Sequence, residues 1–216
     1  MKELPIRGAI FDLDGTLFDS MGVWTEVDRA FLSKRGIPMP EDYHDEIKCR
    51  NFPEAAAYTK TRFSLPECEQ TIMREWFDMT VNAYKNDVLL KPFAYEYLFA
   101  LRAKGIKTGI ATSSKQALYL PVFARCGIAD CFDAIVTTEE TKPKSYPDVY
   151  LETAKRLGVP PHECAVFEDI LVGIKSAKAA GFYTVAVEDE SSLAEREQLR
   201  AAADRYIVSF KELLSF

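Results

Sequence analysis

The sequence has 216 residues, 48% of them hydrophobic and 28% charged, and a formal net charge of -6, which predicts a globular protein with one large domain, or one domain and a smaller one. The negative charge, without any block of consecutive Lys or Arg, argues against a binder of nucleic acid or of anionic membranes. No run approaches the roughly 18 apolar residues of a transmembrane helix, and residues 1–5 lack the apolar core of a signal peptide.

The first predicted element is a buried strand over residues 6–11, a short apolar run. Asp12 and Asp14 follow it directly, then Gly15, which permits a sharp turn, and Thr16, which offers a hydroxyl. Ligands of open α/β sheets bind beyond the carboxyl ends of the strands, so this position suits chemistry. A calcium loop also begins Asp-x-Asp, but the glycine and the glutamate that it needs further on are missing here.

The middle of the chain, residues 20–87, is predicted to be helical throughout. Residues 20–35 carry apolar side chains at helical spacing, and Gly36 ends the pattern. Further helices are predicted to begin near Pro53 and Leu65, and no convincing strand interrupts them. This part of the chain is therefore expected to be an all-helical insertion.

From residue 89 onward, predicted strands alternate with predicted helices. The strands are residues 107–111, 134–137, 164–167 and 183–187, and the helices are residues 92–104, 116–125, 147–157 and 171–180. The tail from Ser192 adds one or two helices and a short strand near Tyr206 and Ile207. This alternation predicts right-handed βαβ units and a parallel sheet.

Four groups of polar residues fall at strand ends or in loops on one predicted edge of this sheet, because parallel strands bring their carboxyl ends together. They are Asp12 with Asp14, Thr112 with Ser113, a lysine at Lys142 or Lys144, and Glu168 with Asp169. Each group alone has an ordinary explanation as a helix cap, a turn or a solvated loop. Together they predict one reaction centre.

The chemistry of such a centre follows from its charges. Several carboxylates in one cleft repel one another and need a cation, and Mg²⁺ fits because it takes hard oxygen ligands and keeps positions for water and substrate phosphate. A lysine and hydroxyl or backbone N–H groups supply the positive charge and donors that a phosphoryl group needs. One aspartate can then attack phosphorus to form an aspartyl-phosphate, while the other moves the proton on the leaving oxygen.

These residues resemble the four ordered motifs of the haloacid dehalogenase superfamily, in its branch with phosphoglycolate phosphatase and β-phosphoglucomutase. The matching positions are residues 12–17 (DLDGTL), residues 111–113 (ATS), Lys144 with Pro147 and Asp148, and Glu168 with Asp169. The resemblance covers essentially the whole chain, and its first motif is highly specific. It implies an α/β fold: a Rossmann-like, doubly wound parallel sheet as catalytic core, residues 1–19 and 90–216, and an inserted all-helical cap domain, residues 20–89.

The resemblance also implies roles for the site residues. Asp12 would be the nucleophile and a Mg²⁺ ligand, and Asp14 the general acid/base, with its backbone carbonyl on the metal. Asp169 would bind Mg²⁺ with help from Glu168, and Lys144 would neutralise phosphate and nucleophile. The implied phosphate contacts are Thr112 and Ser113, and the hydroxyl of Thr16 at the same turn as the two aspartates makes it a further candidate for substrate binding.

The third motif departs from the pattern of its branch, which usually reads Lys-Pro-x-Pro-Asp. Here Lys142 and Pro143 are followed by Lys144, and the aspartate is Asp148. The four-residue step to the aspartate selects Lys144, whereas the Lys-Pro dipeptide selects Lys142. We expect Lys144 to be the active-site lysine because it needs no insertion.

Two positions bear on the reaction. Dehalogenases and phosphonate hydrolases of this superfamily usually lack an acid/base aspartate where this chain has Asp14, which favours phosphatase or phosphomutase chemistry. The β-phosphoglucomutases carry a histidine early in the first cap helix, where this chain has Trp24. We therefore expect a phosphatase of small phosphorylated metabolites, with a sugar phosphomutase as the alternative and a non-catalytic phosphate-sensing or protein-binding module as a third interpretation.

Three residues of the helical block are candidate substrate contacts. Trp24 is either a core aromatic or a substrate-facing one. Arg50 and Asn51, in the segment from Lys48 to Phe52, offer donors that suit a phosphorylated sugar, and a solvated loop is the competing interpretation.

The five cysteines lack the paired spacing of zinc or redox sites, so we expect them to be reduced and mostly buried. We expect the protein to be cytoplasmic and to be a monomer or a weak dimer. Its expected partner is a small phosphorylated metabolite, with no nucleic acid and no membrane.

Overall fold

The computed structural model of the chain describes residues 6–47 and 50–214. It divides into two compact units, of which one comprises Met1–Met21 and Val88–Phe216 and the other Gly22–Asp87. The first unit contains a six-stranded sheet, and the second is helical. That these units act as catalytic core and cap stays a prediction.

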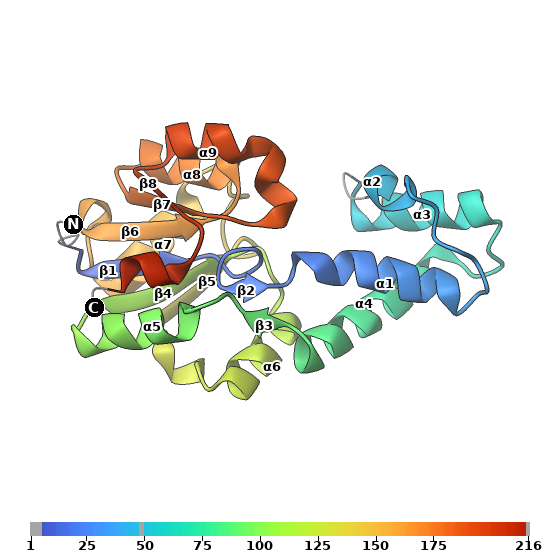
Figure 1. The fold of residues 1–216 in the computed structure, drawn as a ribbon, viewed down its shortest axis with the longest axis horizontal. Helices are drawn as coiled ribbons and strands as arrows, with labels where there is room; N and C mark the ends of the chain where they lie inside the picture. The colour runs from blue at the N-terminus through green and yellow to red at the C-terminus, as the bar shows by residue number, and fades with distance from the viewer. Residues whose placement is uncertain (1–5, 48–49, 215–216) are drawn as a thin grey trace. The chain divides into compact units, whose positions relative to one another are not determined.

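Within the described residues, the sheet of the first unit is parallel throughout, in the order β5-β4-β1-β6-β7-β8 (Figure 1). Its strands are β1 (Gly8–Phe11), β4 (Lys107–Thr112), β5 (Ala134–Thr137), β6 (Cys164–Glu168), β7 (Tyr183–Val187) and β8 (Arg205–Ile207). β4 and β5 lie on one side of β1, and the later strands lie on the other. β1 is thus at the point where the strand order reverses, which is where doubly wound folds bind ligands. The predicted Rossmann-like fold is confirmed.

The helices of this unit flank the sheet. They are α5 (Ala94–Ala103), α6 (Gln116–Cys126), α7 (Asp148–Leu157), α8 (Leu171–Ala179) and α9 (Arg196–Ala202), with short 3-10 turns between elements. α7 contacts β1, β4 and β5, and α8 contacts β6 and β7. The sequence pattern therefore predicted α5, α6, α7 and α8 to within a few residues at each end, and α9 lies in the tail, where one or two helices were expected.

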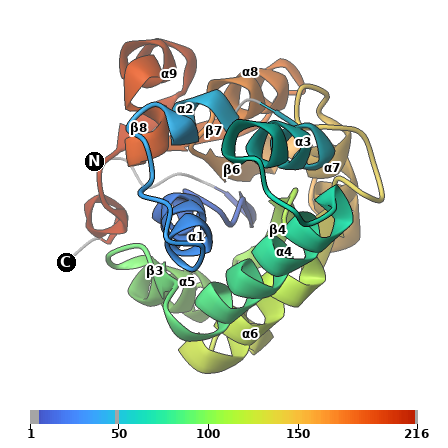
Figure 2. The same ribbon diagram turned by 90° about the vertical axis from the view of Figure 1, so that its right-hand side faces the viewer.

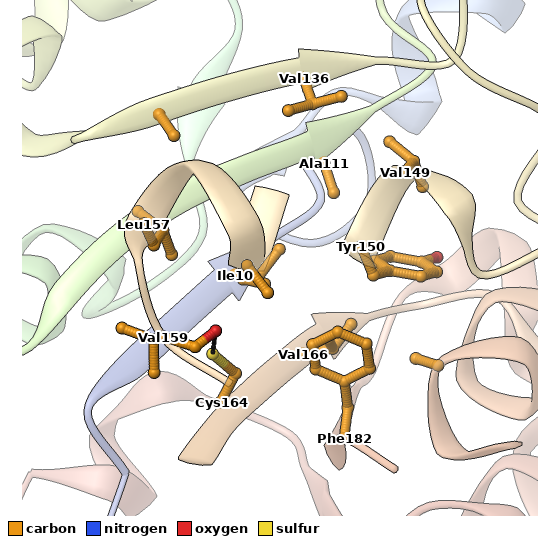
Figure 3. Packing of buried hydrophobic residues seen from close by; sticks show 13 residues of the cluster. Ile10, Ala111, Val136, Val149, Tyr150, Leu157, Val159, Cys164, Val166 and Phe182 are labelled. Carbon is orange, nitrogen blue, oxygen red and sulfur yellow. Dashed lines mark hydrogen bonds between the residues drawn. The ribbon is translucent and has the colours of Figure 1, made fainter. Parts of the chain in front are cut away.

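Successive side chains of β1 and β6 point to opposite faces of the sheet. Ile10 and Val166 belong to an apolar cluster with Tyr150 of α7 on one face (Figure 3). Phe11 and Phe167 stack with ring centroids 4.4 Å apart and pack against the rings of Tyr97 and Phe210. Because side chains alternate, Asp12 and Glu168 belong to the face of Ile10 and Val166, toward α7.

The second unit has an apolar core of its own. Its helices are α1 (Met21–Ser33), α2 (Tyr43–Ile47), α3 (Phe52–Phe63) and α4 (Glu69–Asn86), and α3 and α4 lie side by side (Figure 2). Phe31, Ile72 and Trp76 are buried there. The prediction of further helices after the first one is therefore confirmed, and α2 is a short addition that five residues were too few to signal.

No helix in residues 6–47 and 50–214 has the length and apolar character needed to cross a bilayer. Cys131 and Cys164 are buried, Cys126 is half-buried and Cys68 is exposed, and all four are free thiols. Cys68, which precedes the first turn of α4, is therefore the exception to the expected burial. Cys49, together with Lys48, lies outside the described residues.

A second, two-stranded sheet was not predicted from the sequence. β2 (Phe18–Asp19) pairs antiparallel with β3 (Leu89–Leu90), two strands too short to show a period-2 pattern. Lys91 follows β3, and its backbone N–H donates to the Leu17 carbonyl at 2.8 Å. The Lys91 ammonium lies 2.6 Å from Asp189 Oδ2. This largely buried ion pair ties the strand pair to the loop after β7.

Asp189→Asn should lower the free energy of unfolding by about 2 kcal/mol at neutral pH, because Lys91 loses its charged partner. Burial raises the pKa of Asp189, but Lys91 and Ser191 lower it by more, to below 3.8. The stabilisation is therefore present above the unfolded-state pKa and is lost as the pH falls through the folded-state pKa. Urea unfolding measures the free energy of unfolding of the variant and of wild type. The difference between them should be smaller at a pH below 3.8 than at neutral pH.

Asp130→Asn is the matched control, because Asp130 is exposed. This substitution should leave the free energy of unfolding unchanged at both pH values. An Asp189→Asn variant equally destabilised at both would contradict the assignment.

Candidate active site

The site begins with a tight turn directly after β1. Asp12 continues the pairing with β6, since its backbone N–H donates to the Phe167 carbonyl at 3.0 Å. The N–H groups of Thr16 and Phe18 then both donate to the Leu13 carbonyl, at 3.2 Å and 2.8 Å. The backbone thus turns sharply while Asp12 stays beside Glu168, the last residue of β6.

Gly15 is required in this turn for two reasons. Its φ of +77° lies in the left-handed region that favours glycine. A Cβ added at this position would lie 2.4 Å from Asp169 Oδ2. On the other oxygen, Asp169 Oδ1 accepts a hydrogen bond from the Thr16 hydroxyl at 2.9 Å. The turn therefore fixes the Asp169 carboxylate from two sides.

Three carboxylates meet at this place. Asp12, Glu168 and Asp169 each offer an oxygen atom, and these atoms lie within 4.8 Å of one another. Their residues are only 6%, 0% and 2% exposed. The Lys144 ammonium lies 2.5 Å from both Asp12 Oδ1 and Glu168 Oε1. Within residues 6–47 and 50–214, one ammonium thus faces a group of three carboxylates.

The titration of these groups reflects this shortage of positive charge. Burial is the main reason why the pKa of Asp12 is raised to about 7; within this net shift, Lys144 acts to lower the pKa, and Glu168 and Asp14 act to raise it. Burial also raises the pKa of Asp169, with further increases from Glu168 and Asp12. Burial lowers the pKa of Lys144, but Asp12 and Glu168 raise it by more, so the ammonium keeps its proton.

The cluster fits a divalent metal ion. Glu168 Oε1 accepts hydrogen bonds from Lys144 and from the Tyr150 hydroxyl, the latter at 2.7 Å. Glu168 Oε2 is buried and has no hydrogen-bond partner among the described residues. A buried carboxylate oxygen without a partner is costly, and hard oxygen ligands of this kind suit Mg²⁺.

The structure brings Lys144, and not Lys142, to the carboxylates. The side chain of Lys142 is 60% exposed and pairs with Asp148 Oδ1 at 3.0 Å. The backbone at Lys144 is fixed from α8, because the Ser176 hydroxyl donates to the Lys144 carbonyl at 2.6 Å.

The remaining core candidates lie near the carboxyl ends of β1 and β4. Asp14 is half-buried, and its Oδ1 accepts a hydrogen bond from the Ser20 hydroxyl at 2.8 Å. Thr112 ends β4 and is 1% exposed, and its Oγ1 accepts a hydrogen bond from the Ser114 backbone N–H at 3.0 Å. Ser113 is exposed. These placements are compatible with the predicted roles, which stay predictions.

The three candidates of the helical unit have contacts within that unit. Trp24 is half-buried and packs edge-to-face with Phe52. The Arg50 guanidinium donates to the Glu46 carbonyl at 2.8 Å and lies over the Tyr58 ring. Asn51 is the N-cap of α3, and its side chain accepts a hydrogen bond from the Glu54 N–H. The capping role accounts for Asn51 on structural grounds, and substrate contact stays a prediction for all three.

The supporting residues of the site were not predicted from the sequence; they are Ser20, Tyr150, Gly173 and Ser176. A Cβ at Gly173 in α8 would lie 2.7 Å from the Tyr150 hydroxyl. Tyr150 reads as one of the apolar positions of α7, and the only available signal was its place two residues after the motif aspartate Asp148. Gly173 and Ser176 are small residues within a helix, and the sequence gives no indication of which side chains lie against such residues.

This fold and this acidic centre define a Rossmann-like α/β enzyme with its site at the carboxyl edge of the sheet. The sequence matches the family of haloacid dehalogenase-like hydrolases over residues 6–181, and the chain belongs to that family. The resemblance identified from the four motifs is confirmed.

Individual relatives differ in the reaction that their names give. The chain is 31% identical over 206 residues to a bifunctional riboflavin kinase/FMN phosphatase of Arabidopsis thaliana, and this match covers 94% of the chain but 53% of that protein. It is 28% identical over 177 residues to a phosphorylated carbohydrates phosphatase of Thermotoga maritima, with 82% of each chain covered. The crystal structure of a candidate β-phosphoglucomutase from Thermotoga maritima superposes with a TM-score of 0.84 at 26% identity, covering 96% of this chain and 97% of that one.

Gly15→Ala should destabilise the protein more than Gly105→Ala. Both glycines have a left-handed φ, +77° and +71°, but a Cβ at Gly105 meets no atom within 4 Å. Each alanine therefore costs about 1–2 kcal/mol of backbone strain, and only Gly15→Ala adds about 1–3 kcal/mol for displacing Asp169. Urea unfolding measures the difference, and equal losses would show that the approach of Asp169 to the turn is not a tight constraint.

Proposed function

We propose that the protein is a Mg²⁺-dependent phosphatase of small phosphorylated metabolites that forms an aspartyl-phosphate on Asp12. The observation that carries the proposal is the position of Asp12, with Lys144 2.5 Å away and the Glu168 and Asp169 carboxylates beside it. The phosphatases among the relatives support the same class of reaction.

The acidic cluster supports a metal role. Asp12, Asp169 and Glu168, with the backbone carbonyl of Asp14, would hold Mg²⁺. The bound ion supplies positive charge against the carboxylates and the phosphoryl oxygens, which lets a carboxylate and a phosphate approach each other.

The side chains divide the remaining work. The Asp12 carboxylate attacks phosphorus, the phosphorus–oxygen bond to the leaving group breaks, and Asp14 gives its proton to the leaving oxygen. Asp14 then takes a proton from a water molecule that attacks the aspartyl-phosphate, which releases inorganic phosphate and restores the Asp12 carboxylate. The Lys144 ammonium stabilises the negative charge of Asp12 and of the phosphoryl group in both steps. The hydroxyls of Thr112 and Ser113 donate hydrogen bonds to phosphoryl oxygens.

The helical unit would act as a cap that excludes bulk water and selects the substrate. Trp24, Arg50 and Asn51 are the residues of this unit that the proposal assigns to substrate, and Thr16 is a further candidate in the core. A cytoplasmic location and a monomeric or weakly dimeric state complete the proposal. Trp24, where β-phosphoglucomutases carry a histidine, favours water over a sugar hydroxyl as the acceptor.

A panel of phosphate esters assayed with Mg²⁺ tests the reaction. Wild-type protein should release phosphate from at least one small phosphorylated metabolite, and removal of Mg²⁺ by a chelator should abolish the release. Asp12→Asn should lose about 10³-fold or more of kcat, because the nucleophile is removed, whereas the exposed Asp130→Asn should keep wild-type activity.

The same panel separates the alternatives. Isomerisation of glucose 1-phosphate that depends on a bisphosphate activator would favour the phosphomutase. No hydrolysis of any ester with Mg²⁺ would favour a non-catalytic phosphate-sensing module.

Lys144→Ala should lower kcat/KM for an active ester by about 10²–10³-fold, because the only ammonium placed against Asp12 among the described residues is lost. Lys142→Ala should change it by about twofold or less, since this side chain is exposed. Steady-state kinetics of both variants measure the ranking, and the opposite ranking would reverse the assignment of the lysine.

A further inference from the structure

A buried tyrosine contacts the acidic cluster from α7. Tyr150 is 0% exposed, and its hydroxyl donates to Glu168 Oε1 at 2.7 Å. Its ring packs among apolar side chains of the sheet and contacts the Phe182 ring edge-to-face, with centroids 6.4 Å apart (Figure 3). Because the close-packed core fixes the ring, the position of the hydroxyl is fixed as well.

The two oxygens of Glu168 have different surroundings. Oε1 takes two donors, the Lys144 ammonium and the Tyr150 hydroxyl. Oε2 is buried without a hydrogen-bond partner among the described residues. A carboxylate with two hydrogen-bond donors on one oxygen cannot rotate freely, so the position of its other oxygen, here Oε2, is fixed as well.

α8 supports the same pair. A Cβ at Gly173 would lie 2.7 Å from the Tyr150 hydroxyl and 2.8 Å from Glu168 Cδ. The backbone of α8 therefore leaves just enough space for the tyrosine and the glutamate to meet.

We propose that Tyr150 is a positioning residue of the metal site, whose hydroxyl holds Glu168 Oε1 so that Oε2 remains the ligand atom. The inference rests on the proposed function and deepens it. Without the hydroxyl, Lys144 would be the one side chain among the described residues that still donates to the Glu168 carboxylate, which could then rotate to give the ammonium either oxygen. The ion would then lose a preorganised ligand.

Tyr150→Phe tests the proposal, since it removes the hydroxyl and keeps the ring. Isothermal titration calorimetry with Mg²⁺, without substrate, should show the dissociation constant raised by about 10-fold, the effect of losing an outer partner of a metal ligand. The Mg²⁺ concentration for half-maximal hydrolysis should rise in parallel, with kcat at saturating Mg²⁺ nearly unchanged. Tyr119→Phe is the control, because this buried tyrosine lies in α6 and packs against Phe123; its Mg²⁺ binding should equal that of wild type.

An unchanged Mg²⁺ dissociation constant in folded Tyr150→Phe would overturn the proposal, and so would a loss of kcat at saturating Mg²⁺ without a change in binding. If circular dichroism shows Tyr150→Phe unfolded, 4-fluorophenylalanine incorporated at position 150 decides the question. The fluorine fills the place of the hydroxyl but donates no hydrogen bond to Glu168 Oε1, so the Mg²⁺ dissociation constant must rise, and an unchanged constant would overturn the proposal. Calorimetry needs no turnover: wild-type protein that binds Mg²⁺ but hydrolyses no ester would contradict the proposed function alone, and wild-type protein that binds no Mg²⁺ would overturn the role of Tyr150.

Discussion

The constraint on which the structure depends is the burial of three carboxylates within reach of one another. Asp12, Glu168 and Asp169 lie out of water, and in the part of the chain that the structure describes one ammonium, that of Lys144, lies against them. Such a group is unfavourable in a folded core unless each charge has a partner. The partners come from separate parts of the chain: the turn after β1, the loop before α7, and α7 itself. A divalent ion would neutralise the negative charge that Lys144 leaves unpaired. The functional proposal is therefore based on this site.

The fold meets this constraint through ordinary sheet geometry. β1 lies between β4 and β6, and the register that pairs Phe11 with Phe167 puts Asp12 beside Glu168. The alternation of side chains sends aromatic rings to one face and the carboxylates to the face of α7. Two glycines, Gly15 and Gly173, leave the space that the acidic side chains occupy. The chemistry therefore depends on backbone positions that carry no functional group.

The two units have different parts in the proposed reaction. Among the described residues, every group placed at the acidic centre belongs to the sheet unit, whereas the match to the haloacid dehalogenase-like hydrolases, over residues 6–181, includes the helical unit as well. The helical unit has its own apolar core around Phe31 and Trp76. Relatives named as FMN phosphatase, carbohydrate phosphatase and β-phosphoglucomutase share the family of this chain. These names span several phosphorylated compounds, in keeping with the rule that a shared fold does not by itself determine the substrate.

The sequence by itself determined the class of fold, because helices and strands of this length leave periodic apolar patterns, and it determined the acidic motif after β1, because those residues are adjacent. It also selected Lys144 by spacing, but only the tertiary structure showed Lys142 in solvent and Lys144 against Asp12. The β2–β3 pair and the contact of Tyr150 with Glu168 left no local pattern. Local periodicity is written into neighbouring residues, whereas the partner of a buried polar atom is fixed by packing between segments that are distant in the chain.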